Sequence, residues 1–540
     1  MNPDTPTSAA PPPTDRLLAA LAGLVSAYVS LAVADLVASR VRPEAAPVPA
    51  VGGAVVDRTP AGVKEWAIRT FGEADKTVLT VGILLLLGLL AVAIGRIALR
   101  NRALGAAAAG AFGVIGAVAA VTRPDSDSAL DALPSPAGAA CGALLLYVLA
   151  GRLGAPGGGN RRGAEPRPGP AAGRADRRGF LLVAGGAGLA ATGAVALGRA
   201  AGSPVQERAA ASRAALRLPR PASPAPPVPA GAQLPVPGIS RFLTPNGDFY
   251  RVDTALVVPK VDADRWRLRL HGLGVREETV LTLPRLMARP AVERDITLAC
   301  VSNEVGGPYV GNARWLGVPL ADLLREAGVR PPSQGGPADQ LVARSVDGMT
   351  IGTPVEDVMD GRDALLAYGM NGEPLPFAHG FPVRMVVPGL YGYVSACKWI
   401  TSLELTTFDA YDAYWVPRGW AAEAPVKTQS RIDTPRALAR PDAGTVTVAG
   451  VAWAQHRGVE RVEVRIDDGP WRPARLAAPT GRDTWRQWSY AWEAAPGRHT
   501  IGVRATDATG ATQPEPRKDT MPDGAEGWHT VEVTVRGRRT

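Results

Sequence analysis

The sequence predicts a multi-domain chain with an all-α membrane region of about five helices, an α+β domain and a C-terminal immunoglobulin-like β-sandwich. Three observations support this fold class. Apolar residues make up 46% of the chain and are concentrated in residues 1–200. A proline-rich stretch then leads into a polar part where helical and strand-like runs mix. From residue 428 onward the runs are of the alternating, strand-like kind.

Five apolar segments each approach the ~20 residues that cross a bilayer. They are residues 17–38, 77–94, 103–122, 137–153 and 180–197. Two of them, 103–122 and 180–197, are rich in Ala and Gly and only weakly apolar. Buried helices of a soluble domain are therefore the alternative for these two. We expect residues 1–200 to form the membrane region.

Loop charges orient the predicted spans, because Lys and Arg gather on the cytoplasmic side. Arginines follow the second and fourth spans, whereas aspartates follow the third. The arginines are Arg96, Arg100, Arg102, Arg152, Arg161, Arg162, Arg167, Arg174, Arg177 and Arg178, and the aspartates are Asp125, Asp127 and Asp131. We expect a multi-pass cell-membrane protein with a cytoplasmic N-terminus and an extracytoplasmic soluble part. The loop after the first span, which has basic residues and the helical pattern GVKEWAIRTFGEA, agrees less well.

Arg177 and Arg178 stand directly before the fifth span in the sequence RRGFLLVAGG. This pattern is typical of a twin-arginine export signal, here placed inside the chain, and such signals admit proteins that have already folded. Two ordinary positive-inside residues are the alternative explanation.

Composition argues against several other classes of protein. All five histidines, His271, His379, His456, His499 and His529, follow the predicted spans, so we expect no haem between the membrane helices. Three cysteines without a CxxC pair predict neither an iron–sulfur cluster nor a zinc site. The formal net charge is +9, but no basic stripe with interleaved aromatics is present, so we expect no nucleic-acid partner.

The soluble part divides by pattern into three segments. Residues 201–238 predict a linker, because its portion 217–238 contains eight prolines and favours an extended spacer. Residues 239–427 mix helical and strand-like runs and predict the α+β domain. Residues 428–540 alternate apolar and polar residues between Gly, Pro and Asp turns, which is typical of an immunoglobulin-like sandwich of about seven strands.

Several motifs in the soluble part, in a consistent order, carry a resemblance to a known family. They are LACVSNEVGG, ARWLGVPLADLL, LLAYGMNGEPLPFAHGFPVRMVVPGLYGYVSACKWI and SRIDTP. Across residues 240–535 the chain resembles the sulfite oxidase family of mononuclear molybdenum enzymes. The resemblance implies one molybdenum–molybdopterin cofactor per chain. It also implies a homodimer formed through the C-terminal sandwich.

The resemblance implies that Cys300 is the metal ligand and a catalytic residue. A soft thiolate suits a metal that cycles through two electrons, and the metal keeps the thiol deprotonated. From the residue alone, an ordinary buried cysteine is the alternative. A disulfide with Cys397 is a further alternative, although it would consume the metal ligand.

The resemblance also implies a set of cofactor-binding residues, since a pterin phosphate needs cations and amides. The candidates are Asp248, Phe249, Tyr250, Arg251, Ser302, Asn303, Asp347, His379, Arg384, Ala396, Cys397 and Lys398. Arg251 is expected beside the substrate as a second catalytic residue. Trp420, which falls near the family's substrate-side tyrosine, is the third. For Asp347, a solvated surface carboxylate is the alternative.

The chain departs from the family pattern on the substrate side. Animal and plant members have an additional arginine shortly before the last strand, where this chain has Met521. The loop after Cys300 is also shorter and lacks a tryptophan. Because a sulfite dianion needs several fixed cations, the departures favour a less charged or larger substrate.

The residues therefore predict a membrane-anchored, outward-facing oxidoreductase that moves an oxygen atom and two electrons to or from a small molecule. Electrons would be exchanged with a separate cytochrome or membrane redox carrier. Reduction of a sulfoxide or nitrate is the alternative to an oxidase reaction. Two further alternatives are a non-catalytic extracytoplasmic binding or sensor domain, and a membrane transporter or electron conduit with an accessory soluble part.

Overall fold

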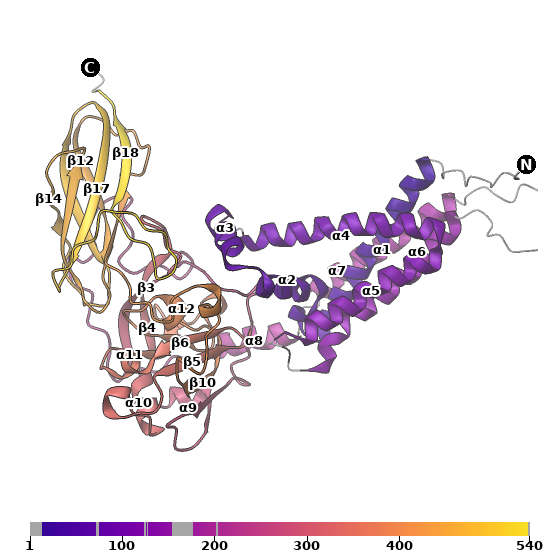
Figure 1. The fold of residues 1–540 in the computed structure, drawn as a ribbon, viewed down its shortest axis with the longest axis horizontal. Helices are drawn as coiled ribbons and strands as arrows, with labels where there is room; N and C mark the ends of the chain where they lie inside the picture. Colours follow the sequence, from indigo (N-terminus) through magenta and orange to yellow (C-terminus); the bar gives the residue numbers. More distant parts are fainter. Residues whose placement is uncertain are drawn as a thin grey trace, which may run out of the picture. The chain divides into compact units, whose positions relative to one another are not determined.

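The structure is a computed structural model that describes residues 13–71, 75–123, 126, 128–153, 177–200 and 204–537. The chain forms two compact units, each described here by itself (Figure 1). The first contains Met1–Arg208 and Ala255–Val257. The second contains Ala209–Thr254 and Val258–Thr540.

The first unit is all-α, as predicted. Its α-helices are α1 (Pro13–Arg40), α2 (Pro47–Arg58), α3 (Ala61–Phe71), α4 (Asp75–Arg100), α5 (Arg102–Val121), α6 (Pro134–Leu153) and α7 (Arg177–Ala200), and α8 (Pro204–Ala215) follows. Within the described residues, five segments are long and apolar enough to cross a membrane. They are Thr14–Arg40, Lys76–Arg100, Arg102–Val121, Ala129–Leu153 and Arg177–Ala196. Each overlaps one of the predicted spans.

Small residues bring the long helices together. A Cβ on Gly23 of α1 would lie 2.0 Å from the Ala91 carbonyl oxygen of α4, and one on Gly95 would lie 2.1 Å from that of Ala19. Such close backbone approach is how membrane helices gain packing energy where lipid offers no hydrophobic driving force. The glycines of these helices therefore serve as contact points between neighbours.

Helices α1 and α7 run parallel. The Tyr28 and Thr192 hydroxyls are 2.9 Å apart, and Arg177 donates to the Thr14 hydroxyl at 3.3 Å. The two contacts join residues 164 and 163 positions apart, a nearly constant offset that only parallel helices give. Arg177 therefore lies on the same side of this unit as the start of α1. The predicted loop residues Asp125, Asp127, Arg161, Arg162, Arg167 and Arg174 lie outside the described residues.

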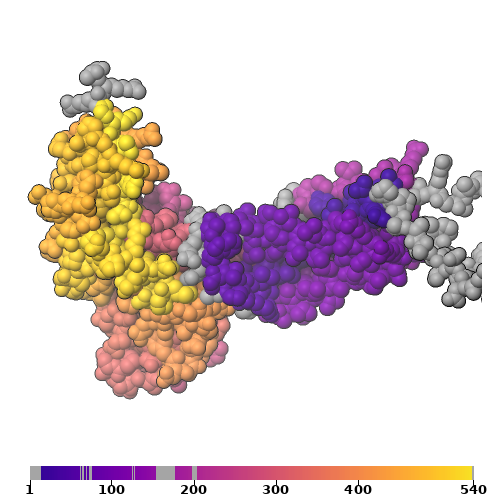
Figure 2. Space-filling view, turned by 45° about the horizontal axis from the view of Figure 1, so that its top comes forward, coloured from indigo at the N-terminus to yellow at the C-terminus, as the bar shows by residue number. Residues whose placement is uncertain are grey.

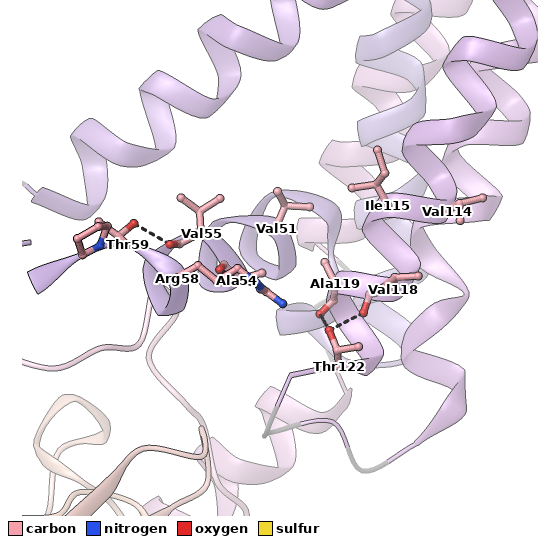
Figure 3. Close-up of a pocket in the computed structure, with 11 residues that line it drawn as sticks. Val51, Ala54, Val55, Arg58, Thr59, Val114, Ile115, Val118, Ala119 and Thr122 are labelled. Atoms are coloured by element: carbon pink, nitrogen blue, oxygen red, sulfur yellow. Dashed lines mark hydrogen bonds between the residues drawn. The ribbon is translucent and has the colours of Figure 1, made fainter. Parts of the chain in front are cut away.

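A groove of about 630 Å³ lies between α2 and α5 (Figure 3). Its walls are mainly Val, Ile and Ala side chains, and Arg58 lies toward one end. The hydroxyls of Thr59 and Thr122 donate to carbonyls of their own helices, Val55 and Val118, both at 2.7 Å. The groove is therefore apolar apart from Arg58 and the threonines.

The α+β domain is built on two sheets. Its strands are β1 (Arg267–Gly272), β2 (Thr279–Thr282), β3 (Val292–Ala299), β4 (Val310–Pro319), β5 (Gln340–Ser345), β6 (Thr350–Pro354), β7 (Leu365–Met370), β8 (Glu373–Pro374), β9 (Arg384–Val386) and β10 (Ile400–Thr406). One sheet has the order β2-β1-β10-β5-β6. The other has the order β3-β4-β7-β8, with β9 paired to β7.

Short helices complete this domain and cover the sheets. They are α9 (Leu283–Met287), α10 (Leu320–Glu326), α11 (Val355–Met359) and α12 (Gly392–Ser395). The core between the layers contains large side chains that are fully buried, among them Trp315, Tyr368 and Phe381. The antiparallel pair β3–β4 ends with Ala299 opposite Val310, so Cys300 begins the loop that joins the two strands.

The C-terminal domain is the predicted sandwich. Its strands are β11 (Gln429–Thr434), β12 (Gly444–Trp453), β13 (Val459–Ile466), β14 (Arg472–Pro473), β15 (Arg475–Leu476), β16 (Arg486–Ala494), β17 (Gly497–Asp507) and β18 (His529–Val535). They form two four-stranded sheets, β11-β12-β16-β15 and β14-β13-β17-β18. Alternate residues such as Val462 and Val464 face the core between the sheets.

The sandwich and the α+β domain belong to one unit and pack directly on each other (Figure 2). The Trp485 backbone N–H donates to the Thr297 hydroxyl at 2.7 Å, and its indole N–H donates to the Phe242 carbonyl at 2.9 Å. These buried bonds join the base of the sandwich to β3.

The predicted linker, residues 201–238, is more ordered than an extended spacer. It contains α8, and its later part lies along the second unit. The Ala222 N–H donates to the Ala291 carbonyl at 2.7 Å, and the Leu234 N–H donates to Gln487 Oε1 at 2.6 Å. The prolines prevent regular structure, but the remaining N–H groups find partners in the folded domains.

One sandwich carboxylate predicts a pH-dependent stability. Asp507 is buried, and it accepts hydrogen bonds from Thr509, Ala511, Thr428 and Arg457. Burial alone raises its pKa, but the bonds from Thr509, Thr428 and Arg457 outweigh this and lower it to about 2. The charged form therefore stabilises the fold above pH ~4, and this stability is lost as the pH falls toward 2.

We expect Asp507→Asn to lower the stability of the sandwich at pH 7 by about 2 kcal/mol. Thermal unfolding of the full chain in detergent, followed by tryptophan fluorescence, would measure the change. The difference from wild type should shrink between pH ~4 and 2. Asp468→Asn, at an exposed position of the same domain, is the control and should have little effect. A difference that stays constant with pH would contradict the assignment.

Candidate active site

Cys300 is held at the start of a closed loop. Its N–H donates to the Tyr309 carbonyl at 2.9 Å, and its own carbonyl accepts the Asn303 N–H at 3.1 Å. The Asn303 side-chain oxygen accepts the Tyr309 N–H at 2.7 Å, which closes the loop. Burial raises the pKa of the Cys300 thiol, although hydrogen bonds from Ser302 and the charge of Lys398 act against this. Such a thiol requires a bound cation to become a thiolate.

Arg384 is a buried cation with an incomplete set of partners. The side chain is 5% exposed and lies over the Trp315 ring, 4.9 Å from its centroid. Its terminal nitrogens donate to the carbonyls of His379 and Ala396 at 3.2 and 3.3 Å. Its Nε has no partner in the described part of the chain. Burial lowers the Arg384 pKa to about 10. Two neutral carbonyls poorly satisfy a buried guanidinium, so this position needs a further acceptor.

His379 lies on the same loop as Arg384 and is also buried. Its Nε2 is 2.9 Å from the Asn246 carbonyl, so this nitrogen donates and Nδ1 is left as an acceptor. Burial lowers the His379 pKa to about 4, which keeps the ring neutral near pH 7. Phe249 packs against His379, with ring centroids 5.5 Å apart, and stacks on Tyr250 at 5.2 Å.

Two cations of the site share one carboxylate. Asp253 Oδ2 lies 2.9 Å from Arg251 Nε and 2.7 Å from Lys398 Nζ, and the Asp253 side chain is 2% exposed. Asp253 is not among the predicted site residues, although an acid two residues after Arg251 in the first cofactor segment is a usable signal. Asp347 lies close by and accepts from the Thr254 hydroxyl at 3.4 Å and the Met349 N–H at 3.3 Å. Burial raises the Asp347 pKa, and the residue is half-buried, so its role at the cofactor stays a prediction.

Tyr250 and Cys397 lie in the interior of the same site. Burial raises the Tyr250 pKa well above its usual range, and Cys300 and Arg384 both act on it. Cys397 is buried, and its carbonyl accepts the Met385 N–H at 2.8 Å. All three cysteines of the chain are free, so the alternative of a Cys300–Cys397 disulfide does not hold.

Two of the candidate residues stand apart from this cluster. Asp248 is exposed, and its N–H closes a turn on the Pro245 carbonyl at 2.9 Å. Trp420 is 6% exposed and packs against Tyr393 and Trp415, with centroids 5.7 and 6.5 Å away. Met521, at the position where animal and plant family members have an arginine, packs beside Gly419. Roles for Asp248 and Trp420 stay predictions.

Two family models match the soluble part of the chain. Residues 255–415 match the oxidoreductase molybdopterin binding domain, and residues 429–533 match the bacterial Ig domain. The arrangement around Cys300 fits a molybdopterin. The buried guanidinium of Arg384 lacks an acceptor at Nε, and a thiol, a lysine and a free histidine nitrogen converge on the same region.

We expect Arg384→Lys to lower the pterin content of the purified chain about tenfold, because a lysine cannot reproduce the planar donors of a buried guanidinium. Pterin released and oxidised to its fluorescent form would be measured per chain. Arg362→Lys is the matched control, since the Arg362 side chain is buried but pairs with Asp357 and Asp360 away from Cys300. Equal losses in both variants would contradict a direct role for Arg384.

Curated relatives match about half of the chain. Sulfite oxidase of Gallus gallus is 33% identical over 321 residues, which are 51% of this chain and 69% of the relative. Mitochondrial sulfite oxidase of Homo sapiens is 30% identical over 344 residues, 55% of this chain and 62% of the relative. Nitrate reductase [NADH] 1 of Oryza sativa subsp. japonica is 30% identical over 335 residues, 51% of this chain and 36% of the relative. This chain belongs to the sulfite oxidase family of molybdopterin oxidoreductases.

Proposed function

We propose that the chain is a membrane-anchored, outward-facing molybdenum oxidoreductase that transfers an oxygen atom to or from an uncharged small molecule. The observation that carries the proposal is the convergence of Cys300, His379 and Lys398 on Arg384. Arg384 is a buried cation whose Nε lacks an acceptor. When bound, the cofactor supplies the two-electron oxygen-transfer chemistry. The protein holds it, excludes water and shapes the substrate pocket.

The residues of the proposed site bind either the metal, the pterin or the substrate. Cys300 is the metal ligand, and Ser302 supports its sulfur by hydrogen bonds. Cations and polar groups hold the pterin and its phosphate, together with backbone atoms at Ala396 and Cys397. They are Tyr250, Asp347, His379, Arg384 and Lys398. Arg251 stands on the substrate side, and Trp420 supports that side from the core.

The charge balance of the site supports a neutral substrate. Arg251 is the cation assigned to the substrate side, and its Nε pairs with Asp253 Oδ2, which also pairs with the cofactor-side Lys398. A dianion such as sulfite needs two or three uncompensated donors or cations. Met521 supplies neither a donor nor a cation, and Trp420 carries one indole N–H and no charge. A sulfoxide, which presents a dipole and apolar substituents, suits these groups better than sulfite or nitrate.

The membrane location rests on the first unit. Its long apolar helices support a multi-pass anchor, and the parallel pair α1 and α7 supports a topology with an odd number of crossings. Arg177 and Arg178 open α7 on the side where α1 begins, as an internal twin-arginine signal requires. We infer that the second unit is extracytoplasmic, without a haem, iron–sulfur cluster or zinc of its own. It exchanges electrons with a cytochrome or a membrane carrier and dimerises through its sandwich.

We expect the full chain, purified in detergent after cofactor-competent expression, to contain about one molybdenum and one pterin. Cys300→Ser should remove the thiolate-to-metal absorption and most of the molybdenum, because a hydroxyl is a much poorer ligand for this metal. Cys141→Ser is the control and should keep both, since Cys141 is an exposed cysteine on α6 of the first unit. A folded wild-type chain without molybdenum would refute the proposed function.

The loaded chain would next be assayed with a dialkyl sulfoxide and reduced viologen, and with sulfite and ferricyanide. We expect kcat/KM for the sulfoxide to exceed that for sulfite by at least about tenfold, which corresponds to one missing cation contact in a partly buried site. Faster turnover of sulfite would contradict the neutral-substrate inference and leave the cofactor assignment intact.

We expect the soluble part to lie outside the cytoplasm. Alkaline phosphatase, which is active only outside, should be active when fused after Thr122, the end of α5. It should be inactive when fused after Arg100, the end of α4. The reverse pattern would show that the N-terminus is extracytoplasmic.

A further inference from the structure

The loop that begins with Cys300 is contacted from outside its own domain. It joins β3 to β4 and contains Gly306 and Gly307 at its far end from the sheet. Gly307 donates its N–H to the Glu304 carbonyl at 2.8 Å, which makes a tight turn there. Two residues of the sandwich, Arg431 and His529, contact this turn. We call them the sandwich clamp.

Arg431, on β11, holds the turn by a charged hydrogen bond. One terminal nitrogen donates to the Gly307 carbonyl at 2.8 Å. The other terminal nitrogen donates to the Ser240 hydroxyl at 2.9 Å, and Nε donates to Asp433 at 2.8 Å. The Arg431 and Asp433 side chains are both largely buried. The guanidinium is thus fixed in direction by two partners, and its third bond fixes the loop.

His529, at the start of β18, packs on the same turn. A Cβ on Gly306 would lie 2.3 Å from its Cδ2 and 2.4 Å from its Nε2, so a side chain at Gly306 would collide with the ring. Gly306 also has a φ of +81°, which disfavours other residues. The His529 Nδ1 accepts the Ile432 N–H at 2.9 Å, which fixes the ring orientation. Ile432 follows Arg431, so one strand segment sets both members of the clamp.

We propose that Arg431 and His529 are positioning residues that fix the Cys300 sulfur for metal binding, so that the sandwich is part of the active-site support. This inference rests on the proposed function for its purpose but not for its geometry. The path is short and continuous. Arg431 holds Gly307, the loop is closed by Asn303 and Tyr309, and Tyr309 holds the Cys300 backbone.

The test measures the alkylation rate of the Cys300 thiol in the cofactor-free full chain, which is produced in a host that lacks molybdopterin. Cys300 is 9% exposed, so its alkylation by iodoacetamide requires the loop to open. We expect Arg431→Gln to raise the alkylation rate of Cys300 about tenfold, the effect of losing one charged hydrogen bond on an opening equilibrium. Peptide mass spectrometry would follow each cysteine separately, and Cys397 serves as the internal reference because it lies outside the loop.

Two further variants separate positioning from general stability. Arg486→Gln removes a half-buried sandwich arginine that bonds only to the sandwich carbonyls of Ala477 and Val459, and it should leave Cys300 alkylation unchanged. Arg431→Lys keeps the charge and a donor, so Cys300 should be partly protected from alkylation in this variant. If Arg431→Gln does not fold, Arg431→Lys provides the measurement in its place. In loaded protein, Arg431→Lys should shift the thiolate-to-metal absorption and lower kcat more than it changes KM.

An alkylation rate in both Arg431 variants within twofold of wild type would overturn the proposal, as would an equal increase in Arg486→Gln. Because alkylation is measured without cofactor, this result is independent of the proposed function. A chain that binds no molybdenum but shows faster Cys300 alkylation in Arg431→Gln would refute the enzyme assignment and keep the clamp. Normal molybdenum content with unchanged Cys300 alkylation would support the enzyme assignment and refute the clamp.

Discussion

The arrangement of the site depends on one buried cation, Arg384. The guanidinium of Arg384 is fixed by two backbone carbonyls and the face of Trp315, and its Nε has no partner in the described part of the chain. A buried charge without full pairing costs several kcal/mol in a protein interior, so a chain that retains one is built for an acceptor that the protein does not supply. His379 and Ala396 supply those two carbonyls. Under the proposed function, a cofactor bound at the unpaired Nε would add its binding free energy to the stability of this region.

The same reasoning sets the charge of the site. The more accessible Arg251 is tied to Asp253, which also pairs with Lys398. A carboxylate held between two cations stiffens both side chains and lowers the positive potential that a second anion would meet. Under the proposed function, Arg384 and Lys398 would engage the cofactor, and a substrate would meet a polar but weakly charged surface beside Arg251. The distances around Asp253 support a neutral oxygen-atom donor in that proposal.

The order of elements was predictable from the sequence because each part has its own periodicity. The apolar runs gave the long helices, and the alternating runs after residue 428 gave the sandwich. Local motifs identified Cys300, His379, Arg384 and Lys398, since each stands in a distinctive string. Contacts between distant segments could not be read in this way. Nothing near Arg431 in the sequence indicates that it reaches Gly307, 124 positions earlier. The proline-rich stretch was expected to be a spacer, because composition predicts the absence of regular structure but not where the remaining N–H groups bond.

An enzyme whose core is completed by a cofactor made in the cytoplasm has to acquire it before it crosses the membrane. An export route for unfolded chains would deliver a domain in which the donors of Arg384 face an empty interior and the Cys300 loop has no ligand to hold. A route for folded domains avoids this. The proposed twin-arginine signal, Arg177 and Arg178 at the start of α7, would direct the chain to such a route. The clamp between sandwich and loop strengthens the requirement, because Arg431 can support Cys300 only after both domains have folded together. In the proposed topology the signal stands after four candidate spans and before the last crossing. The anchor would therefore be present while the domain that follows is still in the cytoplasm and can be loaded.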